Sequence, residues 1–148
     1  MKQQFRLSKE EFDFIYSKVP RLSVEVLLKD PKKGVFLTKR SLEPCKGQWH
    51  LPGGTVYFGE SLKDAVRRVA ERELDIVVIN SKQNGYIEYP SHYLNDLDSP
   101  VGLVFEVTGY TGTLKPNKEA LDSGWFTRLP SPMHADQDRY LLNNGYID

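Results

Sequence analysis

A glycine-rich loop that runs directly into an amphipathic helix, from Gly53 to Ile76, is the feature that most constrains the fold of this chain. Ser61 is typical of a helix N-cap, and the acidic Asp64 follows three residues later. Apolar residues then recur at helical spacing and form one stripe of side chains: Leu62, Ala65, Val66, Val69, Ala70 and Leu74. The stretch therefore predicts a helix that packs one face onto a core, with a glycine loop before its N-terminus.

Glu73 lies near the middle of that stripe, four residues after Val69 and seven after Val66. A carboxylate that faces a core is costly unless a partner neutralises its charge. One interpretation places Glu73 at a frayed helix end, where its side chain reaches water. The alternative is that Glu73 turns toward a cation at the glycine loop, because hard cations bind carboxylate and backbone carbonyl oxygens.

The composition excludes several classes of protein. The chain has 148 residues, the size of one domain, and its 20 basic residues balance 20 acidic ones. This balance does not favour general binding to nucleic acid or to an anionic membrane. Cys45 is the single cysteine, which rules out an internal disulfide and fits a cytoplasmic protein. No apolar run approaches the roughly 20 residues of a membrane span, and the N-terminus lacks the hydrophobic region of a signal peptide.

The remaining segments alternate between helical and strand patterns. A capping box at 8–11 predicts a short helix that ends before Pro20. Strands are expected at 22–28, 35–39, 76–79, 101–107 and 125–127, and the segment 86–89 either continues or follows the strand at 76–79. A polar loop is expected at 90–100, a turn or edge at 108–117 and a final helix at 136–143. This order predicts a mixed α/β fold with helices on both sides of a sheet. Glu25 lies in the first strand, either facing solvent on the polar side or contacting a ligand.

The glycine loop and helix resemble the Nudix box. The residues in register with that motif are Gly54, Glu60, Arg68, Glu73 and Ile76, with a match just upstream at Pro52 and Gly53. The usual box has two further Glu and a Gly where this chain has Val69, Arg72 and Asp75. The resemblance implies an α/β/α sandwich with a mixed sheet, formed by residues 1–148 as one domain. It also implies catalytic roles for Glu60 and Arg68, although Glu60 could instead simply favour the helix N-terminus through the dipole.

Within the Nudix enzymes, the chain resembles the branch of GDP-mannose mannosyl hydrolases, which also lack two of the box acids and keep the last Glu. The likeness extends to Pro20, Ser23-Val24-Glu25, Lys39-Arg40 and His134-Ala135. By position, it implies that the metal ligands are the Gly53 carbonyl, Glu73 and Glu119. That branch has its catalytic His directly after the third ligand, where this chain has Ala120.

The same resemblance implies three further site residues. Arg40 is expected near the leaving diphosphate, where a guanidinium suits developing negative charge. Glu25 is expected among the substrate-binding residues, and His92 lies in the loop where the branch has another active-site His. Because Val69 replaces a box Glu, the general base cannot come from that turn of the helix, and Glu119 or His92 could serve instead.

These observations predict a Mg²⁺-dependent Nudix hydrolase, with Mn²⁺ as an alternative metal, that acts on a nucleoside diphosphate derivative. A nucleotide sugar is the favoured substrate. Two alternatives stay open: a pyrophosphohydrolase that cuts at phosphorus, and a non-catalytic Nudix-like module that binds a nucleotide. The expected partner is a small-molecule nucleotide, not nucleic acid or a membrane, and the oligomeric state is left open, with a homodimer as one alternative.

Overall fold

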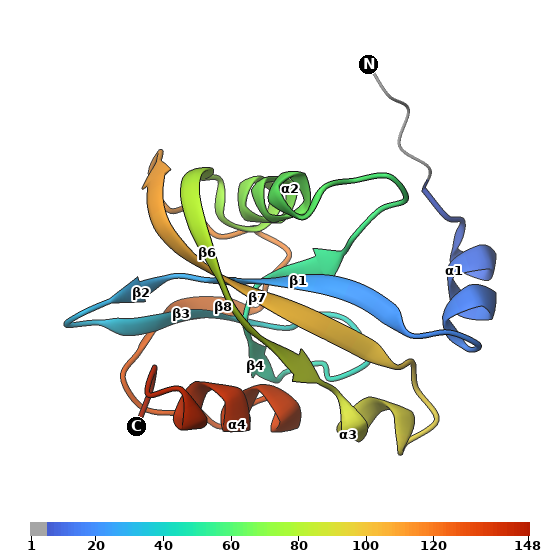
Figure 1. Ribbon diagram of the computed structural model, residues 1–148. Coiled ribbons are helices and arrows are strands. Elements are labelled where there is room, and N and C mark those ends of the chain that lie inside the picture. Colours follow the sequence, from blue (N-terminus) through green and yellow to red (C-terminus); the bar gives the residue numbers. More distant parts are fainter. Residues whose placement is uncertain (1–5) are drawn as a thin grey trace.

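The computed structural model describes residues 6–148, and its strands form two sheets that lie between helices (Figure 1). The larger sheet has the strand order β5-β1-β7-β6. Its strands are β5 (Gly53–Thr55), β1 (Arg21–Leu27), β7 (Pro100–Thr111) and β6 (Val77–Glu88). Strands β1 and β7 are parallel, whereas β5 and β6 pair antiparallel with their neighbours. The larger sheet is therefore mixed, as the sequence predicts.

The smaller sheet is built around β3 (Gly34–Lys39), which pairs antiparallel with three other strands. These are β2 (Lys29–Asp30), β4 (Trp49–His50) and β8 (Asp122–Phe126). Only Leu28 separates β1 from β2, so the chain passes directly from the larger sheet into the smaller one.

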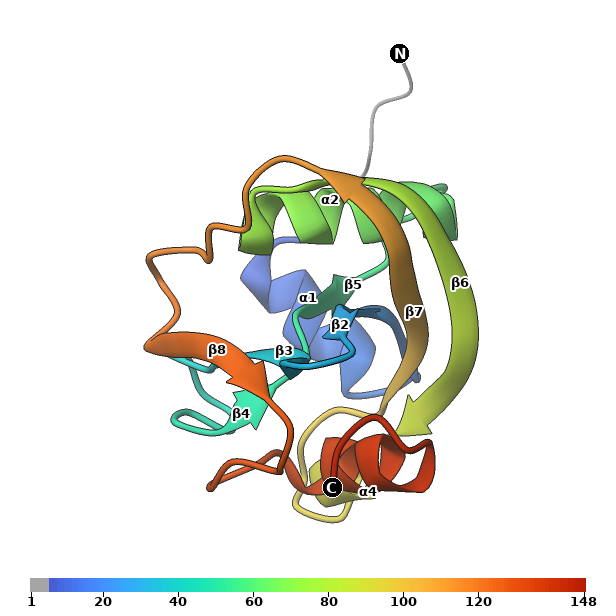
Figure 2. The same cartoon turned by 90° about the vertical axis from the view of Figure 1, so that its left-hand side faces the viewer.

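Helices cover both sides of the strands. Helix α2 (Leu62–Leu74) lies on one side, and α3 (Pro90–Tyr93) and α4 (Ala135–Asn143) lie on the other, while α1 (Lys9–Tyr16) sits at one end (Figure 1). Figure 2 shows that β6 and β7 curve together from α2 to the neighbourhood of α4. The expected α/β/α arrangement is confirmed. None of the helices in residues 6–148 is long and apolar enough to cross a membrane.

Two hydrophobic cores lie on the two faces of β1. Alternate residues Val24 and Val26 face α2 and pack in a core with its buried stripe. Leu27 points to the opposite face and belongs to a second core with residues of β3, the β4–β5 segment and α4: Val35, Leu37, Trp49, Leu51 and Leu141, among others. Because both faces of β1 are covered, polar residues on its second face cannot be assigned to solvent by alternation alone.

Helix α2 forms as its sequence predicts. Ser61 caps it by accepting a hydrogen bond from the Asp64 amide at 3.1 Å. The stripe is buried at Ala65, Val66, Val69, Ala70 and Leu74. The helix ends at Asp75, which adopts the left-handed conformation at φ 57°. The capping box of α1 is also present, since Ser8 and Glu11 exchange side-chain-to-backbone hydrogen bonds.

The segment 86–89 continues the strand expected at 76–79, as one of the two alternatives has it, since β6 runs unbroken to Glu88. Two other strand and loop expectations differ from the structure. Strand β7 continues to Thr111, beyond the expected end at Val107, and the expected loop at 90–100 contains α3. Pairing between the two strands explains their length. Strands β6 and β7 pair antiparallel along most of their lengths, with local shifts in register, so pairing keeps even their polar residues in extended conformation.

Candidate active site

A cleft of about 630 Å³ lies where the two sheets, α3 and the start of α4 meet. Its walls come from segments far apart in the sequence: β1, the segment after β3, β5, α3 and the N-terminal end of α4. The lining residues that matter most below are Glu25, Arg40, Cys45, Gly53, Tyr89, His92, His134 and Gln137. Six of these eight residues have ionisable side chains, and Glu25, Arg40, Gly53 and His92 are among the residues that the sequence predicts for the site.

Glu25 is buried on the face of β1 that points away from α2, with only 6% of its surface exposed. The alternative that it faces solvent is therefore wrong, because α3 and α4 cover this face of the sheet. Burial raises the pKa of Glu25 to about 7, against the opposing effects of a hydrogen bond from Tyr89 and the charges of Arg21 and Arg40. A carboxyl with this pKa can hold or release a proton near neutral pH.

A chain of hydrogen bonds fixes the Glu25 carboxylate. The Tyr89 hydroxyl donates to Glu25 Oε1 at 2.8 Å and accepts from Gln137 Nε2 at 2.9 Å. The Gln137 carbonyl oxygen in turn accepts from the buried backbone N–H of Leu51 at 2.7 Å. The chain joins β1, the end of β6, α4 and the β4–β5 segment.

Gly53 lies directly beside Glu25, on the edge strand of the larger sheet. A Cβ at Gly53 would stand 2.2 Å from Glu25 Oε2, so only glycine fits opposite this carboxylate. The Val26 amide donates to the Pro52 carbonyl at 2.8 Å, and the Val56 amide donates to the Leu22 carbonyl at 3.0 Å. By antiparallel alternation, Gly53 falls between hydrogen-bonded pairs, so its carbonyl points away from β1 and off the sheet edge.

Glu60 and Arg68 form an ion pair that supports the glycine loop. Arg68 donates to both carboxylate oxygens of Glu60, at 2.8 and 3.0 Å, and to the Thr55 carbonyl at 2.7 Å. Its guanidinium also stacks on the Tyr57 ring at 3.7 Å. The Glu60 side chain is only 1% exposed, and neither residue lines the cleft around Glu25. This geometry gives the pair a positioning role, and their predicted catalytic roles stay a prediction.

Glu73 does not face the core. Its side chain is 27% exposed and contacts the Arg72 guanidinium at 3.2 Å. The helix end is not frayed, since Asp75 caps it and the segment after β7 is tied to it. The Asn117 amide donates to the Glu73 carbonyl at 2.9 Å, and Asn117 Oδ1 accepts from the Glu119 amide at 2.9 Å. Glu119 is exposed in this tied segment, so the fold brings the backbones of both predicted acids to the same end of α2.

The three predicted ligands fit a hard divalent cation by donor type. A carbonyl at the sheet edge and two partly or fully exposed carboxylates supply only oxygen, which suits Mg²⁺. The glycine strand also lies close against α2, since a Cβ at Gly54 would stand 3.0 Å from Val69 Cγ2. Val69 is fully buried, so this part of the helix face offers apolar packing where the usual box has an acid. The roles of Gly53, Glu73 and Glu119 as ligands stay a prediction.

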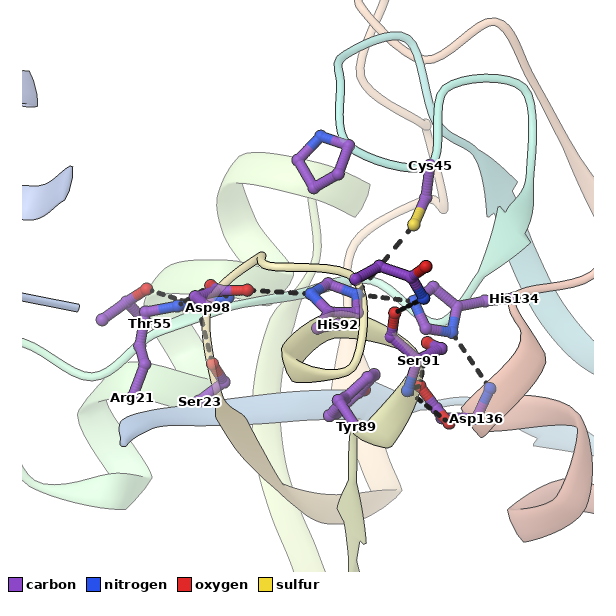
Figure 3. A network of polar contacts seen from close by, with 12 residues as sticks. Arg21, Ser23, Cys45, Thr55, Tyr89, Ser91, His92, Asp98, His134 and Asp136 are labelled. Carbon is purple, nitrogen blue, oxygen red and sulfur yellow. Dashed lines mark hydrogen bonds and ion pairs between the residues drawn. The ribbon is translucent and has the colours of Figure 1, made fainter. Parts of the chain in front are cut away.

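His92 is buried in α3 at the other side of the cleft and belongs to a line of polar contacts (Figure 3). Its Nδ1 lies 2.8 Å from Asp98 Oδ1, and its Nε2 lies 3.0 Å from His134 Nε2. Asp98 also pairs with Arg21 at 2.7 Å. Burial of Asp98 opposes ionisation, but the hydrogen bond from His92 and the Arg21 charge together lower its pKa to about 2.

The hydrogen bond at the His134 end determines which ring nitrogens of His92 and His134 carry protons. His134 Nδ1 accepts from the Asp136 amide at 3.3 Å, as the N-cap of α4. His134 therefore carries its proton on Nε2 and donates it to His92 Nε2, and His92 donates from Nδ1 to Asp98. Burial and the neighbouring His92 lower the pKa of His134 to about 4, so this ring is neutral at pH 7. Both ring nitrogens of His92 are thus engaged within the protein.

Arg40 follows β3 and reaches the cleft beside the glycine strand. Its Nε donates to the Pro44 carbonyl at 2.6 Å, while no side chain or carbonyl among residues 6–148 accepts from its two terminal nitrogens. A guanidinium anchored in this way can present its terminal nitrogens to an anionic group as a fork. Arg40 therefore lines the cleft, and its predicted place beside a diphosphate stays a prediction.

The mixed sheet between helices and the glycine loop that enters α2 define the Nudix class of fold. Residues 19–143 match the NUDIX domain family, so the chain belongs to the Nudix family. It is a Nudix hydrolase by this membership. A MutT NUDIX hydrolase from Burkholderia pseudomallei has the same fold, with a TM-score of 0.72 and 26% identity over 81% of this chain and 95% of that one.

Two relatives extend the comparison. The low-salt glycan biosynthesis protein Agl8 of Haloferax volcanii is 32% identical over 140 residues, which is 92% of this chain and 89% of that protein. The 8-oxo-dGDP phosphatase NUDT18 of Mus musculus is 25% identical over 122 residues, so this chain matches 34% of its length.

Several site residues escaped the sequence analysis. Tyr89 and Gln137 hold Glu25, and Arg21 and Asp98 hold His92, but none of the four stands in a motif. They meet only through contacts between residues far apart in the chain. Only Gln137 has a weak sequence signal, because it is a polar residue at helical spacing from the apolar Tyr140 and Leu141.

Proposed function

We propose that the chain is a Mg²⁺-dependent hydrolase of a nucleoside diphosphate derivative, with a nucleotide sugar as its substrate. The observation that carries the proposal is the cleft itself, which Arg40, Gly53 and the buried Glu25 line together. A diphosphate needs cationic partners, and the hydrolysis needs a group that accepts a proton from water. The cleft holds a residue for each task.

The relatives support this substrate class. The names of two of them refer to nucleoside diphosphate chemistry: an 8-oxo-dGDP phosphatase and the ADP-ribose pyrophosphatase of Methanocaldococcus jannaschii, which is 27% identical over 107 residues. Agl8, at 32% identity, is named for glycan biosynthesis. A glycan pathway uses activated sugars, which makes a nucleotide sugar the favoured member of the class.

A divalent ion held by Gly53, Glu73 and Glu119 would neutralise charge on the diphosphate when bound. The protein's own groups then divide the remaining work. Arg40 holds the diphosphate oxygens with its terminal nitrogens, in the geometry a guanidinium fork provides. Glu25 accepts the proton of the attacking water, because its pKa of about 7 lets it be ionised before the step and protonated after it.

Glu25 suits the role of general base better than His92 and Glu119, the two candidates that the sequence indicates. His92 donates from one ring nitrogen and accepts at the other, both within the protein. Glu119 is exposed and does not line the cleft around Glu25. Glu25 is the buried carboxyl among the acidic residues that line the cleft, and Tyr89 holds its Oε1 so that Oε2 faces Gly53.

The bond that breaks is proposed to be the one at the sugar carbon. A diphosphate is a good leaving group once its charge is neutralised, so a base with a pKa near 7 suffices at carbon. The protein should be incubated with Mg²⁺ and a panel of nucleotide sugars, ADP-ribose and nucleoside diphosphates in ¹⁸O-labelled water, with products identified by mass. Label in the free sugar is expected.

The other outcomes identify the alternatives. Label only in a phosphate product would overturn attack at carbon and leave a pyrophosphohydrolase. Binding without metal-dependent turnover of any substrate would show a nucleotide-binding module. Replacing Mg²⁺ with Mn²⁺ should retain turnover, since both ions accept oxygen ligands. A small-molecule partner and a cytoplasmic location complete the proposal.

A further inference from the structure

Three ligand-type side chains meet at the wall of the cleft opposite the glycine strand. One ligand atom from each of Cys45, His92 and His134 lies within 4.8 Å of the other two, and the Nε2 atoms of the two rings are 3.0 Å apart. His92 and His134 are buried, and Cys45 is half-buried in the segment after β3. Figure 3 shows the thiol pointing toward the two rings. No other group of three His, Cys, Asp or Glu within residues 6–148 has this spacing.

We propose that Cys45, His92 and His134 bind one transition-metal ion of the Zn²⁺ class, with a fourth coordination position open to the cleft. This site is separate from the oxygen-donor site at Gly53, Glu73 and Glu119. It does not depend on the hydrolase reaction proposed above.

The distances agree with tetrahedral zinc. Bond lengths of about 2.0–2.1 Å to nitrogen and about 2.3 Å to sulfur place two imidazole nitrogens about 3.4 Å apart, and sulfur about 3.6 Å from nitrogen. The observed separations are 3.0 Å between the two Nε2 atoms and 3.9 Å between Cys45 Sγ and His92 Nε2. The third pair, Cys45 and His134, lies within 4.8 Å, so side-chain adjustments of up to about 1 Å would centre an ion among the three.

The surroundings of His92 already have the form of a metal site. Asp98 accepts the hydrogen bond from Nδ1 at 2.8 Å, which leaves the lone pair of Nε2 facing the cluster. A carboxylate behind a ligating histidine is the usual outer partner in zinc sites. Arg21 holds Asp98 in place at 2.7 Å, so the imidazole is oriented before any ion arrives.

Binding also requires two proton changes. The Cys45 thiol releases its proton to solvent and binds as thiolate. The proton of His134 moves from Nε2 to Nδ1, so the long 3.3 Å hydrogen bond from the Asp136 amide is exchanged for a metal–nitrogen bond. The other capping contacts of α4 use the His134 carbonyl and are retained.

The ligand types distinguish this site from the predicted Mg²⁺ site. Thiolate and imidazole select zinc-like ions, whereas Mg²⁺ prefers carboxylates and carbonyls. Three protein ligands leave a fourth position for water or an anionic oxygen, and all three residues line the cleft. The ion would also tie the segment after β3 to α3 and α4 across the cleft wall.

The test uses the full chain, stripped of metal and titrated with Zn²⁺ by calorimetry and with Co²⁺ by absorption. Wild type should bind one Zn²⁺ per chain and should show a thiolate-to-cobalt absorption band. Cys45→Ser should lose the band, and His134→Gln should bind Zn²⁺ at least about tenfold more weakly, while Asp98→Asn should lower affinity about 10–100-fold.

Two matched controls should keep both signals. His50→Gln alters the remaining histidine of the chain, whose Nδ1 faces the Leu51 carbonyl at 2.7 Å outside the cluster. Glu73→Gln removes a predicted Mg²⁺ ligand and separates failure of the hydrolase proposal from failure of this one. Absence of the band in wild type, or unchanged Zn²⁺ affinity in Cys45→Ser and His134→Gln, would overturn the site. Cys45 is half-buried in a loop, so its variant tests the site even where a histidine variant fails to fold.

Discussion

At the scale of single residues, Glu25 shows how a carboxyl becomes useful by its position. The side chain is enclosed by the neighbouring strands, where Cβ atoms at Gly53 and Gly102 would stand 2.2 and 2.7 Å from its oxygens. Two glycines thus make the space that the carboxyl fills. Enclosure removes water from the group and raises its pKa to about 7, so the same contacts that bury Glu25 prepare it for proton transfer.

The titration of Glu25 predicts how stability changes with pH. Its pKa is about 7 in the folded chain and 4.5 when unperturbed, so the unfolded chain ionises first as pH rises. Glu25 should therefore contribute about 3 kcal/mol to the free energy of unfolding of wild type below pH 4.5. This contribution should be lost as pH rises from 4.5 through 7.

Glu25→Gln removes this contribution. The difference in unfolding free energy between variant and wild type should shift in favour of the variant by about 3 kcal/mol between pH 4 and pH 8. Urea unfolding in the presence of a chelator measures it. Parallel pH profiles for the two proteins would show that Glu25 titrates normally.

Glu73 allows a test of the predicted Mg²⁺ site. Its carboxylate is partly exposed and pairs with Arg72, so Glu73→Gln should leave the unfolding free energy nearly unchanged. Loss of a ligand carboxylate should lower Mg²⁺-dependent turnover on the order of 100-fold, equivalent to several kcal/mol of transition-state stabilisation. Glu71→Gln, at an exposed position on the same helix, is the control. Turnover at the wild-type rate would exclude Glu73 as a ligand.

At the scale of elements, α2 and the segment that follows β7 act together. Lys115 and Asn117 donate backbone hydrogen bonds to the Leu74 and Glu73 carbonyls, both at 2.9 Å. These bonds use carbonyls that a helix end leaves unpaired. The same contacts set the position of Glu119, so one helix end organises two predicted ligands.

Glu119→Ala tests whether that segment contributes a ligand. The variant should need a higher Mg²⁺ concentration for half-maximal turnover, by about tenfold or more, and excess Mg²⁺ should restore part of the rate. Lys118→Ala, the exposed neighbour, controls for changes in the turn itself. An unaltered Mg²⁺ dependence would make Glu119 an ordinary surface acid.

The end of α2 predicts a stabilising substitution. Asp75 holds φ at 57°, where most residues are strained and glycine is not. Asp75→Gly should raise the free energy of unfolding by roughly 0.5–1 kcal/mol, whereas Asp75→Ala should lower it. The urea midpoint of each variant measures the effect, and a lower midpoint for the glycine variant would contradict it.

These elements also show how far the sequence could predict the structure. The capping residues and the α2 stripe follow from local patterns, because each is fixed by residues close together in the chain. The mixed sheet follows instead from the resemblance to the Nudix box, because its parallel pair joins β1 to the distant β7. For Glu25 the sequence leaves two alternatives open, exposure to solvent or contact with a ligand. Alternation shows that Glu25 lies on the second face of β1, but it does not show what covers that face. The Asp98–His92–His134 line was unpredictable, because it joins segments that meet only through the packing of α3 and α4.

At the scale of the whole molecule, the cleft lies between two layers that are held by different cores. Helix α2 packs on one face of β1 and carries the predicted metal ligand Glu73, whereas α4 packs on the other side and brings His134 and Gln137. Opposite sides of the fold must therefore keep their relative positions for the cleft to keep its shape. The hydrogen bonds from Leu51 through Gln137 and Tyr89 to Glu25 are the polar part of that connection.

This connection predicts energetic coupling between β1 and α4. The Tyr89 hydroxyl accepts from Gln137 and donates to Glu25, so each bond polarises the other. Gln137→Leu should cost about 1–3 kcal/mol of unfolding free energy, because it leaves the buried Leu51 amide without its acceptor. The changes in unfolding free energy caused by Glu25→Gln and Gln137→Leu should depart from additivity by about 1 kcal/mol in the double variant, although the two side chains make no direct hydrogen bond.

The control repeats this double-mutant cycle in a Tyr89→Phe background. The departure from additivity should then disappear, because the hydroxyl that links the two side chains is gone. Coupling that persists without the hydroxyl would mean that the layers communicate through packing alone, and additivity in the original background would mean that the two bonds act independently.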